Sequence, residues 1–396
     1  MSDDRPPISF ILRSRFREFS LAADRIREER HSAPFTVGRL LKTHNNWAAL
    51  ARHPDIQNSG AVEVLGRIAN EALNSDPQYA LSVATLAANI AESLPEGVYP
   101  VINVAQVRSH AWKDYGKALR YVARVPEAIE AFERSATYIE PYGGLMHDLA
   151  IVRFNLAVAL QEANRHAESL LLLHQCKKIF RDYRDARNAA LVTYTEGVLL
   201  QRLNKFREAR ETYLLLLAST TDITKETLAS LHQSIGHCCV DLGDFEQAEA
   251  NFLRGIALHR ELGQPLQALK GELGLGRLYL RRGDYHLVVS HLRPVRRQFI
   301  RKSLFEEAGL CGLEIVQALL LQNRLPEAEN LARKIVHEFV TADLNSRAIT
   351  ALAYLAEAIS TRKATPDLAH DVREYVISLR ATPERDFELT RLRALE

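Results

Sequence analysis

Small, apolar and turn-forming residues recur along the chain in a fixed order. Gly236 is followed by the turn Leu242-Gly243-Asp244-Phe245 and then by Ala248 and Phe252. About forty residues later, Gly276 is followed by a second Gly-Asp-aromatic turn and by apolar residues at the same offsets. Self-similarity at a fixed period is typical of repeat proteins, in which each repeat is one small helical or stranded unit. Here the pattern predicts two helices joined by a short turn.

Six copies of this skeleton are present. Their marker positions are 116, 157, 197, 236, 276 and 316, so successive copies lie 41, 40, 39, 40 and 40 residues apart. The glycines among the markers allow neighbouring helices to approach closely. Gly243 and Gly283 supply a turn position at little steric cost.

These residues resemble the tetratricopeptide repeat (TPR), a helix–turn–helix unit. Trp112, Gly116, Ala128 and Phe132 match its pattern at the usual offsets. The repeat is longer than the common form of about 34 residues, so we expect long helices. Repeats of similar length occur in Rap-type peptide-sensing regulators, kinesin light chain and sensor domains of the maltose-regulator class. The resemblance implies an all-α, right-handed TPR superhelix (an α-solenoid) of paired antiparallel helices around a concave groove, and a protein- or peptide-binding adaptor or scaffold, regulatory in a bacterial setting.

Four segments are predicted along the chain. They are an N-terminal helical and loop segment (1–57), a helical pair that is a candidate degenerate repeat (58–104), the six TPR-like repeats (105–340), and C-terminal capping helices with a tail (341–396). Within the first segment, residues 8–30 read as one amphipathic helix, and residues 31–57 as loop and short helix. Ala348–Ser360 and Pro366–Leu379 form the predicted last pair, which resembles the end of stand-alone bacterial TPR proteins.

Composition and charge limit the functions that the chain can have. It has 396 residues, of which 47% are hydrophobic and 25% charged, as in a soluble folded protein. The net charge of +2 gives no general attraction to nucleic acid or to an anionic membrane. The opening MSDDRPPISF lacks the apolar core of a signal peptide, and no uninterrupted apolar run suits a membrane span. We therefore expect a cytoplasmic protein.

Cys238 and Cys239 are the most suggestive candidates for metal or redox chemistry. Adjacent residues on a helix point about 100° apart, so the two thiols cannot comfortably hold one ion. In the repeat frame Cys239 takes a core position, and free cysteine is a small buried hydrophobe. We expect packing, with redox sensing as the alternative, and neither metal nor cofactor. No H-E-x-x-H, G-x-S-x-G, P-loop or dinucleotide motif is present, so we expect no catalytic activity.

Polar and basic side chains fall at the helix positions that face the groove in TPR proteins. Such a lining suits an extended or helical peptide, because amides can hold its backbone while Lys and Arg meet its acidic groups. Ordinary solvated surface is the alternative. Lys113 and Asn155 match two places of the TPR carboxylate clamp, but the clamp is incomplete, so we expect an internal or acidic peptide rather than a free C-terminus. The groove residues of this prediction are Lys113, Lys117, Arg120, Asn155, Gln161, Tyr194, Gln201, Gln233, His237, Arg277 and Arg281.

A basic cluster runs from Arg277 to Lys302. Eight basic residues stand there with Asp284 alone opposing them, a local net charge of +7. We expect a docking patch for an acidic protein segment; a solvated helix face and nucleic-acid binding are the alternatives. Besides Arg277 and Arg281, the patch consists of Arg282, Arg293, Arg296, Arg297, Arg301 and Lys302.

The rival function is a DNA-binding transcriptional regulator whose TPR array senses a peptide. It requires a helix-turn-helix before residue 60, and residues 8–57 contain enough predicted helix but no clear tight turn between two short helices. The sequence leaves the partner, the regulated pathway and the oligomeric state open.

Overall fold

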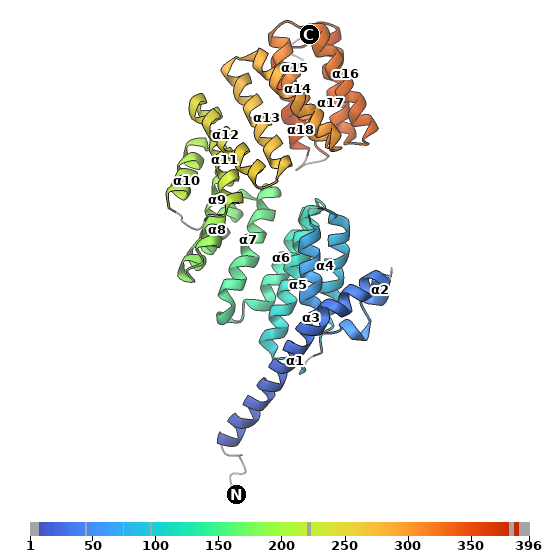
Figure 1. The fold of residues 1–396 in the computed structure, drawn as a ribbon, viewed down its shortest axis with the longest axis vertical. Coiled ribbons are helices and arrows are strands. Elements are labelled where there is room, and N and C mark those ends of the chain that lie inside the picture. Colours follow the sequence, from blue (N-terminus) through green and yellow to red (C-terminus); the bar gives the residue numbers. More distant parts are fainter. Residues whose placement is uncertain are drawn as a thin grey trace. The chain divides into compact units, whose positions relative to one another are not determined.

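The structure is a computed structural model that describes residues 8–43, 46–73, 75–95, 97–219, 223–379 and 384–387. These residues form eighteen α-helices and two short 3₁₀ helices, with no β-strand among them (Figure 1). The predicted all-α class is confirmed.

Sixteen helices form consecutive pairs, and we call the first helix of each pair A and the second B. Residues 58–95 and 348–379 each contain two helices, and most repeat helices reach 17 or 18 residues, as the long period predicts. The pairs are α3 (Ser59–Ala72) with α4 (Pro77–Glu92), α5 (Val101–Tyr121) with α6 (Val125–Ile139), α7 (Met146–Glu162) with α8 (His166–Asp182), α9 (Ala186–Arg202) with α10 (Phe206–Ser219), α11 (Lys225–Leu242) with α12 (Phe245–Glu261), α13 (Pro265–Arg282) with α14 (Tyr285–Arg301), α15 (Phe305–Leu321) with α16 (Leu325–Thr341), and α17 (Ser346–Ser360) with α18 (Pro366–Ser378).

The turn from helix A to helix B has the same backbone form in several pairs. A residue one or two positions after helix A is left-handed, with φ of 79° at Gly243, 92° at Gly283, 57° at Asn204 and 56° at Asn323. Behind Gly243, the amide of Asp244 donates to the Cys239 carbonyl at 2.9 Å, which closes the end of α11. Glycine and asparagine tolerate this conformation best, and for that reason they mark the turns in the sequence.

The marker glycines lie where helix B presses a large side chain against helix A, and at Gly116 and Gly236 this side chain is an aromatic ring. A Cβ atom at Gly116 would stand 2.8 Å from the Phe132 ring, and one at Gly236 would stand 3.0 Å from the Phe252 ring. Phe252 also reaches the next repeat, because a Cβ at Gly274 would stand 2.5 Å from it. The predictions of close helix approach and of aromatic filling between repeats are confirmed.

The chain divides into two compact units, Met1–Val192 and Thr193–Glu396, with the boundary inside α9. The core of unit 1 is built from α1 and α3 to α7, and that of unit 2 from α13 to α18 among its later helices. The period of the repeats runs through the boundary without a break in the sequence pattern.

The first helix is longer than predicted. α1 spans Ile8–Thr43 and continues through Pro34, so the prediction of loop after residue 30 is wrong. Ala33, Val37 and Leu40 on this part of the helix are buried in the core shared with α3, and this burial outweighs the backbone hydrogen bond that Pro34 cannot make. Two short elements follow, α2 (Trp47–Leu50) and η1 (Pro54–Ile56).

This long helix bears on the DNA-binding alternative. A helix-turn-helix needs two helices joined by a turn of three or four residues. The described residues before position 60 instead form one 36-residue helix, a four-residue helix and a 3₁₀ turn. The described residues before position 60 therefore do not form the helix-turn-helix that the DNA-binding alternative requires.

One segment, Gly143–Glu162, is long and apolar enough to cross a membrane by length and composition. It contains α7, whose Leu149, Val152 and Leu156 are buried against α6 and neighbouring residues of unit 1. Packing in a protein core accounts for its hydropathy.

The four cysteines are all free and buried. Burial raises the pKa of the Cys238 thiol to about 12 and also raises that of Cys239. Thiols in this state are neutral and unreactive at neutral pH. The prediction that packing selects Cys238 and Cys239 is confirmed.

Candidate functional site

The face of each A helix that carries the predicted groove positions is called its inner face below. On α5 this face bears Gln106, His110, Lys113, Lys117 and Arg120, at alternating spacings of four and three residues. Residues at this spacing lie in one stripe along a helix. All five side chains are half-buried, so each presents part of its surface to solvent.

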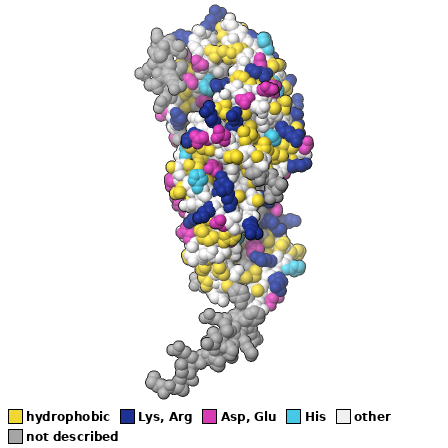
Figure 2. Space-filling model, turned by 90° about the vertical axis from the view of Figure 1, so that its left-hand side faces the viewer, with side chains coloured by type: hydrophobic (Ala, Val, Ile, Leu, Met, Phe, Trp, Pro, Cys, Tyr) yellow, Lys and Arg dark blue, Asp and Glu magenta, His cyan; other side chains and the backbone are white. Residues whose placement is uncertain are grey.

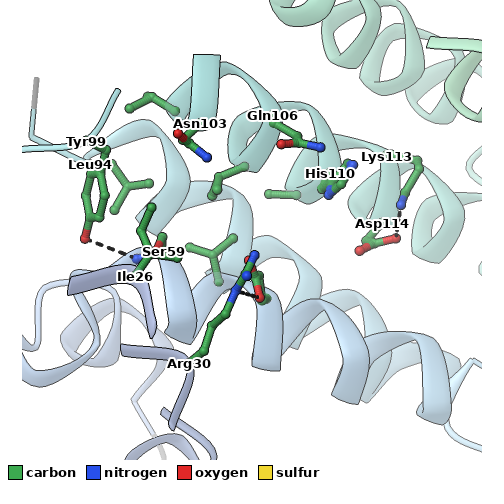
Figure 3. Close-up of a pocket in the computed structure, with 15 residues that line it drawn as sticks. Ile26, Arg30, Ser59, Leu94, Tyr99, Asn103, Gln106, His110, Lys113 and Asp114 are labelled. Atoms are coloured by element: carbon green, nitrogen blue, oxygen red, sulfur yellow. Dashed lines mark hydrogen bonds and ion pairs between the residues drawn. The ribbon is translucent and has the colours of Figure 1, made fainter. Parts of the chain in front are cut away.

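A cavity of about 200 Å³ lies beside this stripe, between α1, α3 and α5 (Figure 3). Ile26, Val62, Leu94, Val104 and Val107 form its apolar part. Its polar part comes mainly from α5, through Asn103, Gln106, His110, Lys113 and Asp114. An apolar pocket with a few convergent polar groups is the usual form of a binding site.

Hydrogen bonds between α1 and α3 hold the far wall of the cavity. The Arg30 guanidinium is paired with the Glu63 carboxylate at 2.6 Å, and Glu29 accepts from the Tyr99 and Ser59 hydroxyls at 2.7 Å each. Burial, together with the Glu29 carboxylate, raises the pKa of Tyr99 to about 12, so the phenol stays a donor. These contacts fix α1 in place over α3.

Two lysines share one carboxylate at the other end of the cavity. Lys113 Nζ lies 3.4 Å and Lys117 Nζ 3.7 Å from Asp114 Oδ1. Asp114 is only 9% exposed, and this oxygen accepts no hydrogen bond. Burial lowers the pKa of Lys117. Arg120, one turn further, is paired with Glu162 at 3.1 Å.

Sequence reasoning found the lysines and missed the rest of this site. His110 and Gln106 occupy the same stripe one and two turns before Lys113, so extending the register backward would have found them. The contributions of Arg30 and Tyr99 depend on contacts between segments distant in sequence, and no local pattern signals them.

The inner-face amides of unit 2 are already used to join one repeat to the next. Tyr194 Oη lies 3.2 Å from Ser234 Oγ, and Gln201 donates to the Ser234 carbonyl at 3.3 Å. Gln233 donates to the Gln267 carbonyl at 3.0 Å. These side chains are part of the inter-repeat contact, and their amide groups are less free to hold a peptide backbone than predicted.

His237 and Arg277 are also engaged within unit 2. The His237 ring stands edge-on to Phe252, 4.9 Å between centroids, and burial lowers its pKa to about 4, with the charge of Arg277 adding to the effect. The imidazole is therefore neutral at pH 7. Arg277 is paired with Asp241 at 3.4 Å, whereas Arg281 is exposed at the end of α13.

The inner face of α15 is closed by the last helix of the chain. α18 packs against α15 more extensively than against its own partner, α17. Under it, Leu310, Leu313 and Leu320 are buried, Leu313 to 1% exposure. Glu314, 2% exposed, is paired with Arg373 of α18 at 3.1 Å.

Two predicted binding residues are wrong because the structure buries them. Gln161 is 3% exposed and lies inside unit 1, so it cannot line an open groove. Arg296 is 6% exposed, and its guanidinium is paired with Glu338 of α16. Asn155, 9% exposed, is a third buried residue of the prediction, and its side chain donates to the Ile151 carbonyl at 2.8 Å.

The predicted basic patch does not form one surface. Arg281 and Arg282 lie at the turn before α14, and Arg301 and Lys302 lie at its other end, about 25 Å away at 1.5 Å per residue. The sequence places these residues close together, but the length of the helix separates them. Arg297, Arg301 and Lys302 remain exposed.

Acidic residues from neighbouring helices neutralise much of this cluster. Arg282 is paired with Glu249 and Asp284, and Arg293 is paired with Glu327 at 2.8 Å. On the face drawn in Figure 2, Lys and Arg side chains lie among Asp and Glu side chains. The local excess of +7 counted along the sequence is therefore smaller in space, because Arg277, Arg282, Arg293 and Arg296 have acidic partners.

Within the described part of the chain, no group of three or more His, Cys, Asp and Glu side chains is arranged to hold a metal ion.

Comparison with known proteins places the fold in the TPR class. No protein-family model and no curated protein sequence matches the chain. Among solved structures, aspartyl phosphate phosphatase F from Bacillus subtilis matches with a TM-score of 0.52 and 9% identity, over 81% of this chain and 84% of that one. A signal transduction ATPase with a tetratricopeptide repeat sensor from Pyrococcus horikoshii matches with a TM-score of 0.51 and 16% identity, over 85% of this chain and 54% of that one.

A Rap protein complexed with competence and sporulation factor is a further match, with a TM-score of 0.48 and 13% identity over 81% of this chain and 99% of that one. Identities this low show the fold alone. The chain is a TPR-like α-solenoid of paired helices, as its repeat pattern predicts.

Proposed function

We propose that the protein is a protein- or peptide-binding adaptor that holds a partner segment on the inner face of α5. The observation that carries the proposal is the cavity beside that face, where apolar walls and polar side chains converge. The inner-face amides of unit 2 are tied into contacts between repeats, and α18 covers α15. The inner face of α5 is the best candidate that remains.

One polar group at the cavity has capacity to spare. The Asn103 amide lines the cavity and makes no side-chain hydrogen bond within the described residues. An amide side chain can meet both the N–H and the C=O of an extended peptide backbone.

A selection from a random peptide library on the full chain tests this proposal. We expect enriched peptides whose affinity falls about 5-fold to 150-fold, or 1–3 kcal/mol, in Asn103→Ala and in His110→Ala. Matched controls are Gln175→Ala on α8 and His286→Ala on α14, both exposed on B helices, and these should leave affinity unchanged. Failure to enrich any peptide, or equal binding by all four variants, would contradict the proposal.

A regulatory role and a cytoplasmic location stay predictions. The DNA-binding alternative is not proposed, because no described element before residue 60 supports it.

A further inference from the structure

We infer that the cavity beside α5 selects an acidic segment, in which an aliphatic side chain fills the apolar part and a nearby carboxylate meets Lys113 and Lys117. This inference rests on the proposed function and adds the chemistry of the partner. It depends on the size of the cavity and on the distribution of charge around it.

The size of the cavity suits a single anchoring side chain. Pockets for drug-sized ligands measure roughly 300–1,000 Å³, and this cavity measures about 200 Å³. Val62, Leu94, Val104 and Val107 supply aliphatic walls, and Tyr99 lines one end with its hydroxyl held by Glu29. A leucine-like side chain of a longer segment fits such a site better than a planar cofactor does.

The end of the cavity at Lys113 and Lys117 has more positive than negative charge. Both ammonium groups depend on the single carboxylate of Asp114, at 3.4 and 3.7 Å. Lys117 additionally donates to Asn70 Oδ1 at 3.3 Å, which is a neutral acceptor. A second carboxylate brought to these lysines would form charge-assisted hydrogen bonds in a place that excludes much of the water.

Other carboxylates near the cavity are already engaged. Glu63 is paired with Arg30, and Glu162 is paired with Arg120. Asp148 accepts from Gln106 at 2.7 Å and lies 3.8 Å from the His110 ring. Glu29 accepts from the Tyr99 and Ser59 hydroxyls at the opposite end. Within the described residues none of these groups is paired with either lysine, so the excess positive charge at that end is left for a partner.

The spacing of the two features sets the spacing within the ligand. Val107 and Lys113 are six residues apart on α5, about 9 Å along the helix axis. An extended chain advances about 3.3 Å per residue. The aliphatic and acidic groups of the segment should therefore stand about three residues apart. The carboxylate can come from an internal Asp or Glu or from a chain terminus.

Synthetic versions of the peptides enriched on the full chain separate these sources. If the protein recognises the internal acid, a peptide carrying Glu and blocked at both ends should bind at least about tenfold more tightly than its Glu→Gln version. If the terminus is read, freeing the C-terminus should give a similar gain, and the Glu→Gln change should give none. Either gain supports the inference, and the absence of both overturns it.

A charge reversal at the protein gives the complementary test. Lys113→Glu should weaken the Glu peptide and strengthen a Lys version of it, whereas Lys178→Glu, on the exposed face of α8, should do neither. Lys113→Gln serves if the reversal impairs folding, and it should reduce the preference for Glu over Gln. Peptides that bind through Asn103 and His110 without any acidic preference would overturn this inference and leave the proposed function standing.

Discussion

The inner faces of α5 and α15 occupy equivalent positions of the repeat, two hundred residues apart in the sequence. They differ in polarity and in burial. His110, Lys113 and Arg120 on α5 correspond to Leu310, Leu313 and Leu320 on α15. The α5 side chains are half-buried beside a cavity, and the α15 side chains are buried under α18. Both faces also carry a buried acid, Asp114 and Glu314 respectively.

The difference shows that the same position of the repeat can form either a covered apolar face or a polar face. Where the chain supplies its own covering helix, the face is apolar and its acid is neutralised by an arginine of that helix. Where the described residues supply no covering helix, the face is polar and its acid is shared by two lysines of the same helix. The inner face of α5 therefore has the residues of a surface that meets solvent or a partner.

The largest expected effect comes from removing the arginine that neutralises α15. Arg373→Ala should cost about 3–5 kcal/mol near neutral pH, because it leaves Glu314 charged and buried. Lys117→Ala should cost far less, since Lys113 still faces Asp114. Urea unfolding followed by circular dichroism measures both, and similar losses would contradict the comparison.

The same variant has a predicted dependence on pH. Burial raises the pKa of Glu314 in the folded state above its unfolded value. Such a group stabilises the fold below its unfolded pKa, and that contribution is lost as pH rises through the folded pKa. The deficit of Arg373→Ala should therefore be smaller at about pH 4.5 than at about pH 7.5. Adding Glu314→Gln to Arg373→Ala should remove this pH dependence. If the stability deficit of Arg373→Ala does not change with pH, Glu314 is not its source.

A reciprocal exchange at the matched position should give the next largest effect. Leu313→Lys should cost about 3 kcal/mol, because it places an unpaired charge under α18. Lys113→Leu should change stability by less than about 1 kcal/mol, because the side chain is only half-buried and a nearby lysine remains. Comparable changes in the unfolding midpoints of the two variants would show that the faces are not different environments.

Glycines at the shared marker position should respond alike in both units. Gly116→Ala would press on the Phe132 ring and Gly276→Ala on the Leu292 side chain. Each should cost about 1–3 kcal/mol through overpacking. Unchanged thermal unfolding of either variant would mean that the close contact at that marker is absent.

The smallest effect is expected at the former basic patch. Arg297→Glu should shift stability by no more than about 0.5 kcal/mol, because the side chain is exposed and makes no ion pair among the described residues. It should also leave peptide affinity unchanged. A strong loss of peptide binding in this variant would restore the patch as a docking surface.

The repeats could be predicted from sequence because packing imposes the same small or aromatic residue at the same offset in each copy. For this reason the roles of Gly116, Phe132 and Phe252 can be recognised from the sequence. The cavity could not be predicted, since α1 builds one wall of it through contacts with α3 across many residues of sequence. The burial of Arg296 was missed because charge counted along the chain ignores Glu338, which a later helix supplies.

The covering of α15 could have been suspected from its residues. Leu310, Leu313 and Leu320 are apolar at positions where α5 is polar, so that face needs a cover. The sequence does not say which segment supplies it, because α18 departs from the pairing that the period implies.

Thiol labelling at matched positions tests the difference between the two faces most directly. The four native cysteines are buried and unreactive, so His110→Cys and Leu310→Cys can each be followed with a maleimide reagent on a quiet background. We predict that the thiol at position 110 reacts at least about tenfold faster than the one at position 310, and that an enriched peptide protects only the former. Equal labelling rates, or protection of position 310 instead, would contradict an open partner surface on α5 and a closed one on α15.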